Sequence, residues 1–349
     1  MLPRERVLAA LEFRPVDKVP VLLFPAAGGL FEHGQKLLDL CRRCGNDFGP
    51  VDSLRLPAPP LPEDFDADGR YHAFRTDEWG TRWEYRIFGV WGHPVTWPLA
   101  DLARLATYSP PPPPPLTGPE FEAARQAAAR HREHFFQLSW CTSLFEKLCS
   151  LRPFQEVLMD IQLDTPDINR AADLLLEHSQ ALVRYALAIG ADGISIGDDF
   201  GTQLAPIFPP AVWRRFFKPR YQVLFEPLVR AGKRVVFHSC GQIEPLLEDL
   251  RDVGVNAIWP QLPLFELRDF SRRCRGLHLA VQLHPDRGEL MQHGTPAQVR
   301  RYLHHLVETF DTLRGGSWIH LEIDPGFPFA NVEALFETVM ELREGAPAV

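Results

Sequence analysis

A histidine and a cysteine two residues apart are the clearest chemical signal in this sequence. The segment 234–240 reads RVVFHSC, which predicts a buried strand that ends in His238 and Cys240. Because successive strand side chains point to opposite faces, these two share one face and Ser239 takes the other. An imidazole nitrogen and a thiolate sulfur that converge on one point suit a zinc ion. The alternative interpretation is a strand-end histidine beside a free cysteine that packs as a small hydrophobe.

A catalytic zinc has three protein ligands and one open position, so a third ligand must come from another strand end. His320 and Glu322 are again two residues apart, on the predicted last strand. We predict Glu322 as the third ligand and His320 as the alternative, with His284 and Cys274 as weaker candidates. Glu322 could instead hydrogen-bond a loop or pair with an arginine.

Other polar residues stand where further predicted strands end. Asp198 and Asp199 are adjacent and suit the orientation of a substrate or general acid–base catalysis, as does His284. The alternative role for one of the two aspartates is to cap a helix or anchor a loop. The residues expected to bind substrate are Gln203, Gln261 and Trp140.

Predicted strands and helices alternate from about residue 134 onward, which is typical of a parallel sheet. The predicted strands are 134–140, 192–198, 234–240, 257–261, 277–283 and 318–323. With a strand at 19–24 and a partner in the region that follows, they make eight, the number of an α/β fold of the (β/α)8 TIM-barrel class. In such a barrel the active site forms at the carboxyl ends of the strands, where the candidates above lie. An open doubly wound sheet is the alternative, although no Gly-x-Gly-x-x-Gly follows any strand.

We predict a single domain over residues 1–349, in which residues 50–118 form an irregular insertion rich in proline and aromatic residues. The run from Pro110 to Pro115 must adopt polyproline II geometry. It predicts a stiff connector, or alternatively a segment that recruits a proline-binding partner. Cys41 and Cys44 form a C-x-x-C pair within a predicted helix, and a lone pair of this kind is weak grounds for a site.

The composition excludes several classes of protein. The net charge of −8 argues against a general nucleic-acid or anionic-membrane binder. No apolar run approaches the ~18 residues of a membrane-spanning helix, and the first residues lack the pattern of a signal peptide. Six cysteines are too few for a disulfide scaffold, so we expect a cytoplasmic protein.

Several segments together resemble the uroporphyrinogen decarboxylase superfamily. They are the start 3–21, then GDDFGTQ at 197–203, FFKPR at 216–220, FHSCG at 237–241, GTP at 294–296 and NVEAL at 331–335. The resemblance covers nearly the whole chain, and the fold of this family is a (β/α)8 barrel.

The resemblance also favours one branch of that superfamily. True decarboxylases carry an arginine-rich motif near the first strand that clamps the carboxylates of the porphyrinogen. Residues 20–29 read PVLLFPAAGG here and contain no arginine. Zinc-dependent corrinoid methyltransferases carry a His-x-Cys, which His238 and Cys240 match. Their third ligand is often a cysteine after the last strand, where this chain has HLEIDPG at 320–326, so Glu322 would have to substitute.

This resemblance implies methyl transfer between a small methylated substrate and a corrinoid (cobalamin) cofactor carried by a partner protein. The aromatic-rich first third suggests a cover for a methoxyaromatic ring, and thus an O-demethylase component. The alternative is a metal-free decarboxylase or lyase of the same superfamily, with Asp198 and His284 as acid and base. A non-enzymatic subunit that docks a corrinoid protein is a third interpretation.

Overall fold

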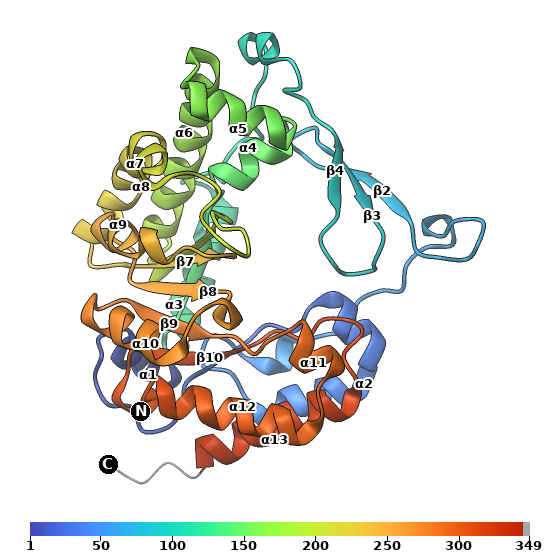
Figure 1. Cartoon of the computed structure of the whole chain (residues 1–349), viewed down its shortest axis with the longest axis vertical. Helices are drawn as coiled ribbons and strands as arrows, with labels where there is room; N and C mark the ends of the chain where they lie inside the picture. Colours follow the sequence, from blue (N-terminus) through green and yellow to red (C-terminus); the bar gives the residue numbers. More distant parts are fainter. Residues whose placement is uncertain (345–349) are drawn as a thin grey trace.

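Seven parallel strands curl into a barrel-like sheet with helices around it, as seen in the computed structural model, which describes residues 1–344 (Figure 1). The strand order is β1-β10-β9-β8-β7-β6-β5. The strands are β1 (Val21–Leu23), β5 (Leu138–Trp140), β6 (Gly193–Gly197), β7 (Arg234–Ser239), β8 (Ala257–Pro260), β9 (Ala280–Leu283) and β10 (Ser317–Leu321). The predicted (β/α)8 TIM-barrel class is confirmed.

The helices follow the strands in the expected alternation. They are α1 (Pro3–Leu11), α2 (Ala27–Cys44), α3 (Pro119–Arg132), α4 (Phe145–Leu151), α5 (Phe154–Leu163), α6 (Pro166–Ala188), α7 (Pro210–Phe216), α8 (Lys218–Arg230), α9 (Leu247–Asp252), α10 (Leu267–Gly276), α11 (Glu289–His293), α12 (Pro296–Thr309) and α13 (Phe329–Glu344). None of the helices in the described part of the chain combines the length and the apolar content needed to cross a bilayer.

Strand alternation divides the buried side chains into an outer and an inner set. Outward residues such as Val235, Phe237 and Ile258 pack against the surrounding helices. The inner set includes Val236, Ala257, Ala280 and Trp318, which form a small apolar cluster with Val7 and Leu11 of α1. Helix α1 therefore plugs the end of the barrel where the strands begin, and the opposite end is left for chemistry.

The region expected to supply an eighth strand does not join the parallel sheet. Residues 50–118 instead carry a separate antiparallel sheet of β2 (Ala73–Thr76), β3 (Arg82–Tyr85) and β4 (His93–Thr96), which projects beside the barrel (Figure 1). Its strands are short and largely exposed, and they carry their own antiparallel pairing, so they cannot lie in the parallel barrel wall. The prediction of an eighth strand within 50–118 was wrong.

Residues 46–48 occupy the place between β1 and the segment that leads into β5. The backbone N–H of Asp47 donates to the carbonyl of Val21 over 2.9 Å, and that of Phe136 donates to the carbonyl of Asp47 over 3.3 Å. The Asp47 carboxylate also accepts the Val21 N–H over 2.8 Å. Three residues that follow α2 thus bridge the two edges of the sheet.

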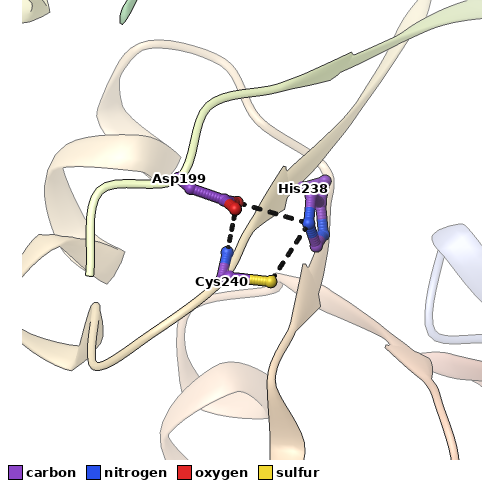
Figure 2. Close-up of side chains that lie close together, drawn as sticks. All are labelled: Asp199, His238 and Cys240. Atoms are coloured by element: carbon purple, nitrogen blue, oxygen red, sulfur yellow. Dashed lines mark hydrogen bonds and ion pairs between the residues drawn. The ribbon is translucent and has the colours of Figure 1, made fainter. Parts of the chain in front are cut away.

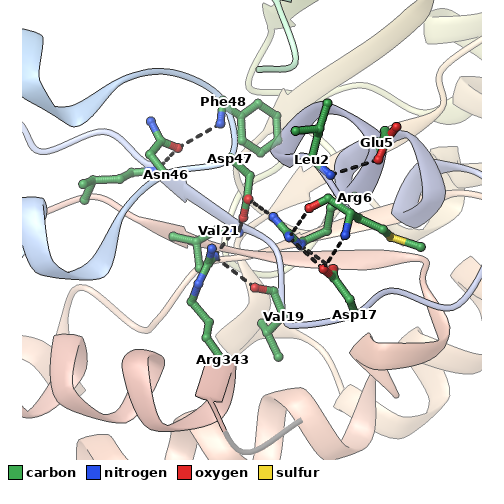
Figure 3. Close-up of polar contacts among 12 residues, drawn as sticks. Leu2, Glu5, Arg6, Asp17, Val19, Val21, Asn46, Asp47, Phe48 and Arg343 are labelled. Atoms are coloured by element: carbon green, nitrogen blue, oxygen red, sulfur yellow. Dashed lines mark hydrogen bonds and ion pairs between the residues drawn. The ribbon is translucent and has the colours of Figure 1, made fainter. Parts of the chain in front are cut away.

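Asp47 is also the centre of a buried group of charges that we call the closure cluster: Arg6, Asp17, Asp47 and Arg343 (Figure 3). Arg343 of α13 lies 2.8 Å from the carboxylate of Asp47, and Arg6 of α1 contacts its other oxygen. Arg6 also pairs with Asp17 over 2.7 Å, and despite some burial these hydrogen bonds hold the pKa of Asp17 well below its usual value. The cluster ties α1, α13 and the bridging segment into one unit.

Candidate active site

Polar residues follow the apolar inner layer at a spacing of two along four neighbouring strands. The first layer lies two residues beyond the apolar residues Val236, Ala257, Ala280 and Trp318, and it consists of His238, Trp259, Gln282 and His320. The second layer lies two residues further along each strand direction, and it consists of Cys240, Gln261, His284 and Glu322. Because every second side chain points into a barrel, this periodicity stacks two polar layers above the apolar plug. The candidate residues therefore gather at the open end of the barrel.

His238, Cys240 and Asp199 form the first cluster in these layers (Figure 2). The His238 Nε2 lies 3.4 Å from the Cys240 Sγ and 3.3 Å from an Asp199 oxygen, and the same oxygen accepts the Cys240 N–H over 2.7 Å. Gly197 allows this packing, since a Cβ there would stand only 3.3 Å from the Cβ of His238. Nitrogen, sulfur and oxygen donors thus converge on one point.

The hydrogen bond behind His238 sets the direction of its lone pair. Its Nδ1 lies 2.9 Å from the carbonyl oxygen of Trp259, which can only accept, so Nδ1 carries a hydrogen. Burial lowers the pKa of His238, which favours the neutral ring. The Nε2 lone pair then points at the cluster, the arrangement that metal-binding histidines share.

The thiol of Cys240 is protonated in the absence of a metal. Burial and the nearby Asp199 carboxylate raise its pKa to about 12. A bound zinc ion would reverse this preference, since a coordinating thiol loses its proton outright. The donor set of this cluster fits zinc in number and in softness.

The two adjacent aspartates point in opposite directions. Asp199 reaches the cluster, whereas Asp198 is fully buried outside the barrel wall. The Asp198 carboxylate accepts the N–H groups of Leu144 over 2.9 Å and Glu146 over 2.7 Å, and it also accepts the hydroxyl of Tyr221. These contacts give Asp198 the loop-anchoring role that was the alternative for one member of the pair.

Glu322 lies in a second cluster, with His284 and His320. Its carboxylate stands 3.4 Å from the Nε2 of His284 and 2.9 Å from the guanidinium of Arg287. The structure therefore does not bring Glu322 together with His238 and Cys240, and the Trp259 ring packs against a histidine of each cluster. The centroid of that ring is 4.1 Å from the His238 ring and 4.5 Å from the His320 ring.

The predicted substrate-binding residues lie around the mouth. The side chains of Gln203 and Gln261 pair over 3.3 Å, and Gln261 also accepts the Gly241 N–H over 3.1 Å, so they brace the turn after Cys240. Trp140 is 66% exposed at the end of β5, and its ring centroid lies 6.4 Å from that of Phe24. These two aromatic residues give the mouth an apolar edge.

Three site residues escaped the sequence analysis: Trp259, Arg287 and Glu146. Extending the period-two rule back from Gln261 would have found Trp259, whereas Arg287 stands in a loop that no pattern marks. Desolvation, together with the charges of Asp198 and Asp199, raises the pKa of the Glu146 carboxyl to about 8 although its side chain reaches solvent. A proton-holding group therefore stands beside the first cluster.

The cysteines outside the site are packing residues. Burial raises the pKa of Cys41 to about 12 and that of Cys44 to about 11, which keeps both thiols in α2 neutral. Cys274 lies buried in α10, ahead of β9, and its pKa is also raised to about 12. None of these three is part of a metal-binding group among residues 1–344.

Comparisons with known proteins place this geometry in a family. The model of the family "Uroporphyrinogen decarboxylase (URO-D)" matches residues 90–342. A solved structure of a methyltransferase from Methanosarcina mazei is similar over 98% of this chain and 99% of its own, with 18% identity and a TM-score of 0.62. A dihydropteroate synthase from Stenotrophomonas maltophilia aligns over 59% of this chain and 69% of its own, with 19% identity and a TM-score of 0.36.

The search of curated proteins finds no match. The likeness to the Methanosarcina mazei structure supports the barrel fold over the whole described chain. The family model spans the strands from β5 to β10 and both polar clusters. The chain belongs to the uroporphyrinogen decarboxylase (URO-D) family.

Proposed function

We propose that the protein is a zinc-dependent methyltransferase that moves a methyl group between a small methylated substrate and a corrinoid carried by a partner protein. The observation that carries this proposal is the convergence of His238, Cys240 and Asp199 on one point. The full-length similarity to a methyltransferase fold supports it. So does the absence of arginine from residues 20–29, because a substrate with many carboxylates would need a basic pocket.

The proposed zinc ligands are the Nε2 of His238, the Sγ of Cys240 and a carboxylate oxygen of Asp199. Asp199 replaces Glu322 of the sequence prediction, because Asp199 lies with His238 and Cys240, whereas Glu322 lies in the other cluster and pairs with Arg287. When bound, zinc supplies Lewis acidity at the heteroatom that carries the methyl group, and the corrinoid of the partner supplies the cobalt that exchanges it.

The residues of this chain prepare that exchange. The carbonyl of Trp259 fixes the ring of His238, and the N–H of Cys240 fixes the carboxylate of Asp199. Glu146 holds a proton near neutral pH and can give it to a leaving oxygen, sulfur or nitrogen. The exposed faces of Phe24 and Trp140 suit an aromatic ring, so we propose a methoxyaromatic substrate and the role of an O-demethylase component.

The first test is the metal content of the purified protein after dialysis against a mild chelator, measured by plasma mass spectrometry. We expect about one zinc per chain in the wild type, and its loss in Cys240→Ser. Cys149→Ser is the matched control, because Cys149 lies outside both clusters and should keep the metal. A wild type that takes up no zinc even on reconstitution contradicts the proposal.

A metal-free decarboxylase or lyase is the alternative that the family name favours. This alternative uses Asp198 and His284 as acid and base. The three hydrogen bonds that the Asp198 carboxylate accepts commit it to the α4 turn and to Tyr221, which leaves this alternative without one of its two residues. Carbon dioxide release from carboxylated substrates by the zinc-free protein would restore it.

A further inference from the structure

The proton positions on His320 are set by a chain of buried hydrogen bonds that starts at Trp318. The indole Nε1 of Trp318 can only donate, and it lies 3.2 Å from the Oε1 of Gln282. The amide nitrogen of Gln282, which also can only donate, then faces the Nδ1 of His320 over 2.7 Å. If the Gln282 amide were turned over, its nitrogen would face the Trp318 N–H, and two donors would meet. The amide nitrogen of Gln282 therefore donates to the Nδ1 of His320, which accepts.

His320 is therefore a hydrogen-bond donor at its other nitrogen. Burial, reinforced by the charges of His284 and Arg287, holds the pKa of His320 well below its usual value, so the ring is neutral. A neutral imidazole with an accepting Nδ1 carries its single hydrogen on Nε2. The Nε2–H of His320 is buried and has no hydrogen-bond partner among the described residues.

The neighbours of that N–H are His284 and Glu322. The Nδ1 of His284 donates to the carbonyl of Pro285 over 2.9 Å, and its Nε2 lies 3.4 Å from the Glu322 carboxylate. Burial alone would raise the pKa of Glu322, but the hydrogen bond from His284 and the charge of Arg287 lower it overall, so the carboxylate is ionised. The carboxylate pairs with Arg287 over 2.9 Å, and its remaining lone pairs make it the acceptor of this group.

One ligand atom from each of these three residues lies within 4.8 Å of the others, and the group offers the His320 donor and the Glu322 acceptor. A metal ion would need a lone pair from each residue, and the Trp318–Gln282 chain puts a hydrogen on the Nε2 of His320. A hydroxyl group matches the set, because its oxygen accepts from the Nε2–H of His320 and its hydrogen goes to Glu322. The residue types alone resemble a metal site, and the hydrogen positions exclude that use.

We propose that His284, His320 and Glu322 form a recess that binds one neutral hydroxyl group of a ligand, with His320 as the donor. The Trp259 ring packs against His238 of the first cluster and His320 of this hydroxyl recess, so the two groups are close enough for one small molecule to contact both. If the proposed function holds, the substrate class is narrowed to methylated compounds that also carry a free hydroxyl group, or to the alcohols that demethylation produces. The existence of the recess itself does not depend on zinc or on methyl transfer.

Nitrogen-15 NMR of protein labelled at histidine tests the hydrogen positions, with peaks assigned by single histidine replacements. We expect the spectrum of a neutral His320 ring with its hydrogen on Nε2. In Gln282→Met, which removes both links of the chain at similar volume, we expect a mixture of the two neutral forms. Trp318→Phe should have the same effect and serves as a second variant if the first folds poorly. A wild-type His320 with its hydrogen on Nδ1 overturns the proposal.

Ethanol is the probe for hydroxyl binding, and acetone is its matched control because acetone accepts a hydrogen bond but cannot donate one. We expect ethanol to shift the Nε2 signal of His320, and acetone, which cannot donate to Glu322, to bind there with lower affinity. In Glu322→Gln the recess loses its charged acceptor, and we expect ethanol affinity to fall about tenfold, as for the loss of a hydrogen bond to a charged group. The proposal fails if ethanol leaves the His320 signal unchanged, or if added Co²⁺ broadens the His320 signal directly in the Cys240→Ser variant. Zinc content does not enter this test, so its outcome and that of the proposed function are read separately.

Discussion

The closure cluster and the hydroxyl recess are both buried and polar, and they differ in how their groups are used. In the closure cluster each charge meets an opposite charge: Asp47 lies between Arg6 and Arg343, and Arg6 also holds Asp17. In the hydroxyl recess the buried Nε2–H of His320 has no hydrogen-bond partner among residues 1–344. A buried polar group normally finds a partner within the protein, because leaving it unpaired is costly. The closure cluster therefore serves stability, and the hydroxyl recess is kept for a ligand.

The largest expected effect lies in the closure cluster. Asp47→Ala leaves two buried guanidinium groups without their carboxylate, so we expect the free energy of unfolding to fall by ~3–5 kcal/mol. Chemical denaturation measures this loss. Glu322→Gln in the hydroxyl recess should cost less than ~1 kcal/mol, because the pair with the half-exposed Arg287 is weak. Equal losses in the two variants would contradict the division of roles.

The next effect separates the two candidates for the third zinc ligand. Asp199→Asn should weaken zinc binding by at least the ~10–100-fold that loss of a supporting residue causes at metal sites, whereas Glu322→Gln should leave zinc affinity unchanged. Competition with a chromogenic chelator gives both affinities. The opposite result would return Glu322 to the ligand set.

A smaller effect concerns pH and Glu146. Its pKa in the folded protein is about 8, raised from the ordinary value of a glutamate, so the folded protein binds a proton that the unfolded chain releases. The stability that this proton gives is complete below the pKa of the unfolded chain and is lost as pH rises through about 8. We expect Glu146→Gln to remove this part of the fall in stability between pH 5 and pH 9, followed by urea midpoints. A wild-type profile retained by the variant would assign the fall to another group.

The smallest effect is expected in the polyproline run. Replacing Pro112 to Pro115, which are exposed, by four Gly/Ser residues should leave methyl transfer to excess partner unchanged. Assays at limiting partner concentration test the alternative, since a recruiting segment would then show a reduced rate. Such a reduction would support the docking interpretation.

Local rules along single strands predicted much of the fold and part of the site. The spacing of two residues correctly put the side chains of His238 and Cys240 on one face, because that rule needs only one strand. The same rule explains why Asp199 enters the barrel and Asp198 leaves it. The alternation of strands and helices predicted the barrel class for the same reason, because each strand or helix is recognised from the pattern of consecutive residues.

Relations between strands could not be predicted from one sequence. Whether Asp199 or Glu322 stands beside Cys240 depends on how neighbouring strands are shifted along one another. The hydrogen-bond chain to His320 likewise needs Trp318 of β10 to pair with Gln282 of β9, a register that only the structure gives. The closing segment 46–48 has no strand pattern, since its partners are a few hydrogen bonds and buried charges.

The plug formed by α1 has a consequence for traffic through the barrel. Val7 and Leu11 fill the end where the strands begin, so the opposite end is the entrance that the packing of residues 1–344 leaves for small molecules. In the proposed reaction a macromolecular partner must present its cofactor at that same doorway. In that proposal a barrel that is entered from one end predicts ordered binding, in which the small molecule enters before the partner docks and leaves after the partner dissociates.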